Sequence, residues 1–179
     1  MKNRGFTLIE LMVVLAVAAI LTLVAVPSFT ALLARNETAS AASELMSSLY
    51  LAQNEATRTG HGIVVCASSN GNTCSGSTDW SNGWIVLDTG APPVYSTATP
   101  TGTLLRVQQP PYGTRIVSSL PSSLLFTSYS SAYLAANSAA GATITLCSTL
   151  DPAEARQVSV SSVMWAVNTP AAQPLAACP

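Results

Sequence analysis

The sequence predicts an α+β protein in which one long N-terminal α-helix packs on an antiparallel β-sheet or sandwich-like head. Two observations predict this fold. Apolar residues in the first third of the chain recur at helical spacing, whereas residues 61 onward form short β-branched and aromatic runs separated by turn residues. No helical segment alternates with these runs, which favours antiparallel pairing. The 179 residues suit one long helix plus one modest domain.

The composition favours an exported protein over a cytosolic enzyme. Hydrophobic residues make up 49% of the chain and charged residues only 8%, whereas about 25% charged residues is usual. Beyond the N-terminal apolar run the chain is rich in Ser, Thr, Ala and Gly, which fits a loop-rich β domain outside the cytoplasm. The net charge of −1 gives no strong field that would attract nucleic acid or anionic lipid.

An apolar run at residues 8–26 is interrupted only by Glu10 and Thr22. As a helix this run would be about 28 Å long, close to the thickness of a bilayer core. Lys2 and Arg4 precede it, so the N-terminus is expected to stay in the cytoplasm and the rest to be exported. An ionised Glu10 would cost about 3 kcal/mol in lipid, and no cation within the run can pair with it.

The start of the chain, K-x-R-G-F-T-L-I-E followed by an apolar helix, resembles the class III prepilin signal of type IV pilins and type II secretion pseudopilins. The resemblance implies that residues 1–5 are a leader, which a membrane prepilin peptidase removes after Gly5. Phe6 would then be the N-methylated first residue, Glu10 the family's glutamate at mature position five, and Pro27 the proline that often kinks pilin helices. The alternative is an uncleaved signal anchor that contains an unrelated acid.

The processed terminus of a neighbouring subunit would supply a positive amine at the depth of Glu10. Filament assembly therefore offers this carboxylate the partner that an isolated helix lacks. We expect Glu10 to help recruit or register the next subunit.

The helix is expected to continue through Pro27 with a gentle bend and to stop at Gly60. It would cover residues 6–58, with a transmembrane half at about 8–26, and residues 59–179 would form the head. A repeating set of side chains predicts the face that packs on the head: Leu45, Met46, Leu49, Ala52, Gln53 and Ala56. Charged residues take other positions: Arg35, Glu37, Glu44, Glu55 and Arg58.

Seven strands are predicted in the head, punctuated by turn residues such as Asn-Gly and Pro-Pro pairs. They are residues 62–66, 83–88, 103–108, 114–118, 123–127, 142–147 and 157–167, the last being either two strands or one bulged strand. Residues 128–140 carry little signal and are expected to be loop. Alternation around Trp80 and Trp84 favours core packing over an exposed aromatic patch.

Four cysteines follow the apolar run, and an even number in an exported chain predicts two disulfides. Three pairings are possible, and we favour the local ones, Cys66–Cys74 and Cys147–Cys178. A metal site is the alternative, but the spacing lacks a CxxC and the single histidine, His61, is far in sequence from two of the cysteines.

Two further stretches resemble the GspH/FimT/FimU group of minor pilins and pseudopilins. Residues 63–88 read IVVCASSNGNTC…DWSNGWIVLD, similar to that group's cysteine-ended strand, small disulfide loop and W-x-x-G-W strand. The late TITLC…ARQVSVSS and the terminal cysteine are similar to the group's ending. The resemblance implies a minor pilin that joins a type IV pilus in its tip or priming complex. The paired cysteines favour a FimU- or FimT-like pilus subunit over the secretion pseudopilin.

The same resemblance implies partners and a location. The partners would be other minor and major pilins, prepilin peptidase and the inner-membrane assembly platform of a Gram-negative bacterium. The subunit would cross the inner membrane once, with its head in the periplasm, before joining an extracellular pilus. The closest alternative is a type II secretion pseudopilin in a short periplasmic filament.

A DNA receptor of the FimT type is disfavoured. The G-R-x-R signature that follows the V-S-V-S strand in such receptors is absent, since residues 163–167 read VMWAV. After leader removal only five basic side chains remain: Arg35, Arg58, Arg106, Arg115 and Arg156. The last three are expected to make surface or inter-subunit contacts, and the sequence does not decide which.

No catalytic constellation is present in the sequence, so we expect neither an enzyme nor a cofactor. His61 lies in a T-G-H-G turn and is expected to be solvated. Asp79, Asp88 and Asp151 are isolated acids in turn-like contexts, and calcium binding is only weakly indicated because no D-x-D-x-D run occurs.

Overall fold

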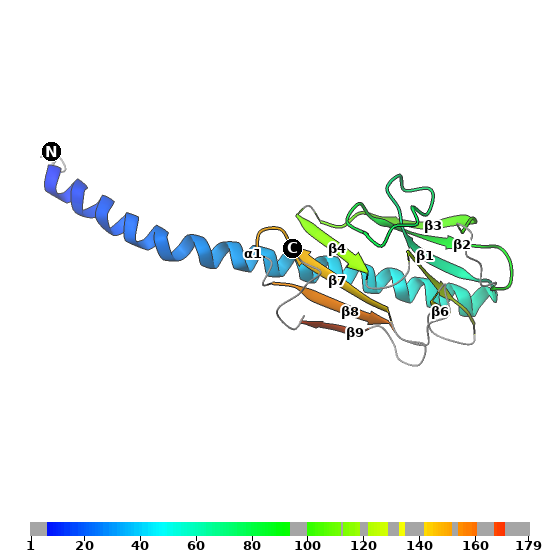
Figure 1. Ribbon diagram of the computed structural model, residues 1–179. Coiled ribbons are helices and arrows are strands. Elements are labelled where there is room, and N and C mark those ends of the chain that lie inside the picture. Colours follow the sequence, from blue (N-terminus) through cyan, green and yellow to red (C-terminus); the bar gives the residue numbers. More distant parts are fainter. Residues whose placement is uncertain are drawn as a thin grey trace, which may run out of the picture.

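The computed structural model (Figure 1) describes residues 7–93, 100–111, 113–118, 122–128, 133–134, 142–151, 154–160 and 167–170. One helix, α1 (Leu8–Thr59), runs into a head built from two antiparallel sheets. The N-terminal half of α1 projects from the head, and the C-terminal half packs against strands of both sheets. The predicted α+β class, with a long helix under a β-rich head, is confirmed.

Local chemistry accounts for both ends of α1. Thr7 is the N-cap, and its hydroxyl accepts the backbone N–H of Glu10 at 3.4 Å. Gly60 has a φ of 74°, and its N–H donates to the carbonyl oxygen of Ala56. Because this left-handed conformation suits glycine, Gly60 ends the helix as predicted. α1 contains 52 residues, which corresponds to about 78 Å.

α1 continues as a helix through Pro27, and its projecting half curves gently in Figure 1. Within the part of the chain that the structure describes, no helix is both long enough and apolar enough to cross a membrane.

In the described part of the chain, nine strands divide into two sheets. The five-stranded sheet has the order β3 (Thr103–Gln108), β2 (Trp84–Asp88), β1 (Ile63–Ala67), β5 (Ser123–Phe126) and β6 (Tyr133–Leu134). The four-stranded sheet has the order β4 (Thr114–Ser118), β7 (Ala142–Ser148), β8 (Arg156–Val160) and β9 (Val167–Pro170). All neighbouring strands are antiparallel, as expected.

The predicted strands agree with the structure except at two places. The stretch predicted as 157–167 contains β8, whereas β9 begins only at its last residue, Val167, and residues 161–166 lie outside the described part of the chain. The prediction that residues 128–140 are entirely loop is wrong, because β6 lies within them and pairs Leu134 with Leu124 of β5. A strand of two residues is too short to produce an alternating pattern.

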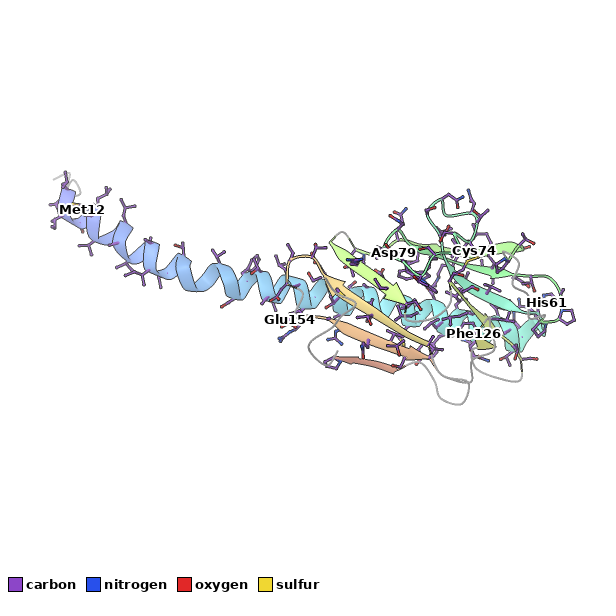
Figure 2. All side chains as sticks on the ribbon, viewed as in Figure 1. Met12, His61, Cys74, Asp79, Phe126 and Glu154 are labelled. Carbon is purple, nitrogen blue, oxygen red and sulfur yellow. A yellow bond between two sulfur atoms is a disulfide. The ribbon has the colours of Figure 1, made fainter. Side chains whose placement is uncertain are left out.

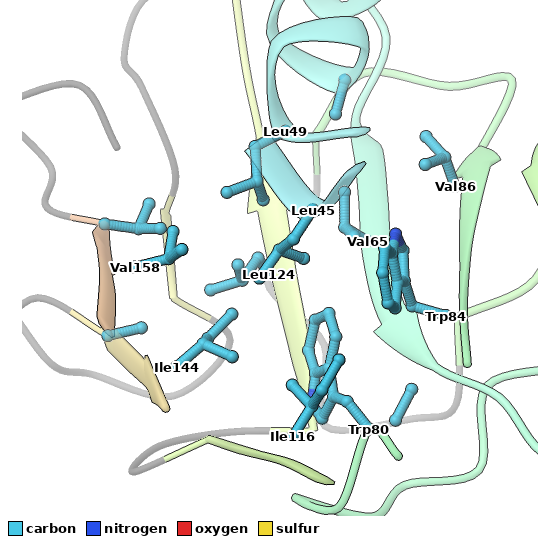
Figure 3. Packing of buried hydrophobic residues seen from close by; sticks show 14 of the residues in the cluster. Leu45, Leu49, Val65, Trp80, Trp84, Val86, Ile116, Leu124, Ile144 and Val158 are labelled. Atoms are coloured by element: carbon cyan, nitrogen blue, oxygen red, sulfur yellow. The ribbon is translucent and has the colours of Figure 1, made fainter. Parts of the chain in front are cut away.

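The main core lies between the second half of α1 and the two sheets. Leu45, Leu49, Ala52 and Ala56 are buried in it, and Met46 packs against it half-buried, so the predicted helix face is correct. In Figure 3, Leu45 and Leu49 of α1 lie between Val65 and Trp84 of the first sheet and Ile144 and Val158 of the second. Trp80 and Trp84 are both completely buried, which confirms their predicted core role.

A buried hydrogen bond joins β2 to α1 inside this core. The indole Nε1 of Trp84 donates to the hydroxyl of Ser48 at 2.9 Å, and that hydroxyl donates to the carbonyl oxygen of Glu44 at 3.1 Å. The buried Ser48 hydroxyl therefore supplies the acceptor that the buried indole N–H of Trp84 needs.

We predict that Ser48→Ala destabilises the protein by about 1–3 kcal/mol, because the buried Trp84 N–H loses its acceptor. Urea unfolding followed by tryptophan fluorescence measures this loss. Ser43→Ala is the matched control: Ser43 is exposed on the same helix and bonds only the carbonyl of Ala39, so a change within about 0.5 kcal/mol is expected. Equal losses in the two variants would contradict the proposed role of Ser48.

Candidate assembly site

The projecting half of α1 is an apolar surface without a covering partner in the described part of the chain. Its large hydrophobic side chains from Leu8 to Leu33 are between 38% and 79% exposed. They are Leu8, Ile9, Leu11, Met12, Val13, Val14, Leu15, Val17, Ile20, Leu21, Val26, Phe29, Leu32 and Leu33. Figure 2 shows these side chains radiating from the projecting helix, with Met12 near its start. A continuous apolar surface of this size marks an interaction site with lipid or protein.

Glu10 is the acidic residue in the first turn of this surface. The ion pairs found among the described residues are Arg35–Glu154, Arg58–Glu55 and His61–Asp88, so in this part of the chain the Glu10 carboxylate has no cationic partner. Gly5 and Phe6, the predicted cleavage and methylation residues, lie outside the described residues. The intermolecular role of Glu10 and the assembly role of Pro27 stay predictions.

Thr7 and Glu10 have a local role that the sequence reasoning missed. The pair fits the S/T-x-x-E pattern of a capping box, and the structure shows one of its two bonds, from the Glu10 N–H to the Thr7 hydroxyl. An acid in the first turn also interacts favourably with the helix dipole. The four residues Thr7-Leu8-Ile9-Glu10 carry this capping-box pattern in the sequence.

His61 and Asp88 form a pair at the end of the head farthest from the projecting helix (Figure 2). The His61 Nδ1 lies 3.0 and 3.1 Å from the two carboxylate oxygens of Asp88. The prediction that Asp88 is isolated is therefore wrong, whereas the His61 side chain is 37% exposed and keeps contact with solvent. The β1–β2 register places Ile63 opposite Asp88, which brings the turn after α1 beside the end of β2.

The pair also holds the turn after β2. The Gly90 N–H donates to the Asp88 carboxylate at 2.8 Å, and the Thr89 hydroxyl donates to the Gly62 carbonyl oxygen at 2.8 Å. Burial alone would raise the pKa of Asp88, but the Gly90 N–H, the His61 ring and the Arg58 charge outweigh burial and lower it.

Asp79 stabilises a turn, as its sequence context predicted. Its carboxylate accepts the Ser81 N–H at 2.9 Å. Burial would raise the pKa of Asp79, but hydrogen bonds from Ser81 and the charge of Arg115 lower it on balance. Asp151 is half-buried in the turn that follows β7.

The arginines make contacts at separate places on the head. Arg35 pairs with Glu154 and Arg58 with Glu55. Arg106 donates from β3 to the Ser47 hydroxyl of α1 at 2.9 Å, so the contact we see for it is internal. Arg115 is exposed on β4, and Arg156 is half-buried at the start of β8. Among the described residues, no group of three or more His, Cys, Asp or Glu side chains could hold a metal ion.

The disulfide of Cys66 and Cys74 closes a small loop beside β1, with 5.6 Å between the two Cα atoms, as predicted. The side-chain Oδ1 of Asn70 accepts the backbone N–H groups of Asn72 and Thr73, which orders the loop. Cys147 is also disulfide-bonded, and its predicted partner, Cys178, lies outside the described residues.

The single long helix, half buried in a β-rich head and half presenting an apolar surface, defines a pilin-type subunit. Family comparison agrees: the model of "Prokaryotic N-terminal methylation motif" matches residues 1–26, and that of "Type II transport protein GspH" matches residues 41–163. The second match covers more than half of the chain, so the chain belongs to the GspH family. The resemblance to the GspH/FimT/FimU group is confirmed.

Individual relatives agree with this family. Over 52 residues, 29% of the chain, the sequence is 48% identical to the type IV major pilin protein PilA of Myxococcus xanthus (strain DK1622). The chain spans about a quarter (23%) of the length of that relative.

Two crystal structures of the type IV minor pilin FimU of Pseudomonas aeruginosa (strain PAO1) share the fold. Their TM-scores are 0.53 and 0.55, each at 20% identity. The similarity covers 73% and 76% of this chain and 91% and 90% of the FimU chains.

We predict that the Asp88 pair stabilises the protein at neutral pH and loses its effect in acid. The folded-state pKa of Asp88 is lowered, so its contribution is complete above the unfolded value of about 3.9 and disappears as the pH falls through the folded pKa. Asp88→Asn should therefore unfold more easily than the wild type at pH 7, with a gap that closes below about pH 4. Urea unfolding at a series of pH values tests this, and a gap independent of pH would contradict it.

Proposed function

We propose that this chain is a minor pilin, a structural and assembly subunit of a type IV pilus that acts in its tip or priming complex. The observation that carries the proposal is the exposed apolar half of α1, attached to a separately packed head in a chain of the GspH family. Family and fold are those of structural pilins, and we propose no catalytic activity and no cofactor for it.

The proposed maturation begins with cleavage. Prepilin peptidase would cut after Gly5 and methylate the new amine of Phe6, and the match of the methylation-motif family to residues 1–26 supports this step. The mature chain would then begin one residue before the Thr7 N-cap, which places its positive amine next to the first turn of α1. An amine at this position can reach the Glu10 of a neighbouring subunit in the filament.

The proposed location before assembly is the inner membrane, crossed once, with the head in the periplasm of a Gram-negative bacterium. The basic Lys2 and Arg4 and the apolar run at residues 8–26 support this orientation. The proposed partners are other minor and major pilins, prepilin peptidase and the inner-membrane assembly platform. In the filament the same apolar side chains of α1 would be covered by neighbouring subunits.

A type II secretion pseudopilin is the second candidate, because the matching family is described as a type II transport protein. A deletion strain separates the two functions. We predict that deletion reduces piliation and twitching, that the protein is found by mass spectrometry in sheared wild-type pili, and that the secretome is unchanged. Normal piliation together with loss of a secreted enzyme would establish the secretion role and reject ours.

We also predict that Glu10→Gln lowers incorporation into sheared pili by about tenfold or more, because a buried amine would lose its charged partner. Gln keeps the capping-box pattern that Ala would remove, so this variant tests the charge rather than the helix start. Thr22→Ala is the matched control: Thr22 is the other polar residue of the run, and its hydroxyl bonds only the carbonyl of Ala19. Quantitative immunoblots of membranes and pili measure both variants. Unchanged incorporation of Glu10→Gln would show that the charge is not needed.

A further inference from the structure

At the base of the head, where α1 leaves it, a side chain of the head adds to the apolar surface of the helix. Leu150 occupies the turn between β7 and β8, and its side chain is 51% exposed. No other large apolar side chain in the described head is as exposed: Tyr50, Leu104, Leu105 and Val107 all fall below it. We define the base surface as Leu150 together with Phe29, Leu32 and Leu33 of α1.

The turn that carries Leu150 is fixed beside one short stretch of α1. Arg35 donates to both carboxylate oxygens of Glu154, at 2.8 and 3.1 Å. The Ser148 hydroxyl donates to the Glu37 carboxylate at 3.4 Å. Figure 2 shows Glu154 beside α1, at the end of the head from which the helix projects. Leu150 is therefore held near the level of residues 35–37 of the helix.

The apolar surface of α1 reaches this same level. From residue 8 to residue 34 the only charged residue is Glu10. This stretch is about 40 Å long as a helix, which matches the thickness of a bilayer with its headgroups rather than that of the hydrocarbon core alone. Phe29, Leu32 and Leu33, on the last turns before the head, are 60%, 52% and 38% exposed. If residue 8 were at the cytoplasmic boundary, Arg35 and Leu150 would lie among the outer headgroups.

The charges near the base indicate the kind of lipid. Arg35 is paired with Glu154, which reduces the cost of placing either charge among headgroups. Acidic residues outnumber basic ones in this region: the acids are Glu37, Asp151 and Glu154, and the bases are Arg35 and Arg156. The base therefore has no basic excess that would attract anionic lipid, and apolar contact with a zwitterionic interface is favoured.

We propose that the base surface contacts lipid: in the unassembled subunit, Leu150 and the adjoining side chains of α1 lie in the outer interface of a zwitterionic bilayer. This inference rests on the proposed membrane anchoring of α1. Two contacts with the bilayer, the helix and the Leu150 turn, orient the head on the membrane, whereas a single helix leaves it free to swing. The head would then be presented to the assembling filament in one orientation.

The test uses the full-length protein in phosphatidylcholine vesicles whose acyl chains are brominated near the carbonyl end. Leu150→Trp and the control Leu105→Trp are compared with the wild type, whose native tryptophan signal is subtracted. Leu105 is exposed on β3, far in the chain from the base. The added tryptophan should be quenched at least about twofold more at position 150 than at position 105, because bromine quenches only at close contact with the interface.

Carbonate extraction of the same vesicles tests the membrane anchoring of α1 separately from the lipid contact of the base surface. Equal quenching in the two variants, with the protein retained after extraction, overturns the lipid contact of the base and leaves the anchoring of α1 intact. Release of the protein by carbonate overturns the anchoring and this inference with it. Stronger quenching at position 150 only in vesicles that contain phosphatidylglycerol overturns the zwitterionic assignment.

Discussion

The structure depends on the burial of one face of α1 between two sheets that share no strand. Ala41, Leu45, Leu49, Ala52 and Ala56 form this face. Two leucines lie between alanines along it, so the helix approaches the sheets closely at the alanines and fills the space between the sheets at the leucines. Each sheet leaves one face in need of cover, and the same helix covers both. The main core of the head therefore depends on the second half of α1, whereas a smaller buried cluster around Cys66, Cys74 and Ile85 contains no residue of the helix.

This arrangement explains how one continuous helix serves two environments. The buried face begins near Ala34, where the first charged residues of the helix after Glu10 also appear. Before that point most of the side chains that the structure describes are apolar and exposed, and such a surface is stable in lipid or among other helices. The two halves of α1 differ in their side chains and not in their backbone, which stays helical from Leu8 to Thr59. Under the proposed function, a subunit would thus exchange lipid for neighbouring helices without refolding its head.

Periodic features of the fold could be predicted from the sequence, and pairings could not. The strands around Trp84 and Cys147 followed from short β-branched and aromatic runs bounded by turn residues, and the stop at Gly60 from glycine chemistry. Strand β6 was missed because two residues carry no period. The His61–Asp88 pair was missed because it depends on the β1–β2 register, which places residues 27 positions apart in contact. The Thr7–Glu10 cap was readable but was overlooked in favour of the membrane context of Glu10.

The scarcity of charge constrains how the subunit chooses its partners. Among the described residues, the ion pairs join groups within the chain, at the base of the head through Arg35 and at its far end through Arg58 and His61. Such pairs stabilise the fold only slightly at an exposed surface, and they use charges that could otherwise pair with a neighbour. Apolar contact along α1 is strong but carries little information about identity. Under the proposed function, selection of one neighbour over another would therefore depend on the shape and hydrogen bonding of the Ser-, Thr- and Asn-rich head, and on Glu10, the charged residue of the apolar run, whose proposed role is to set the register.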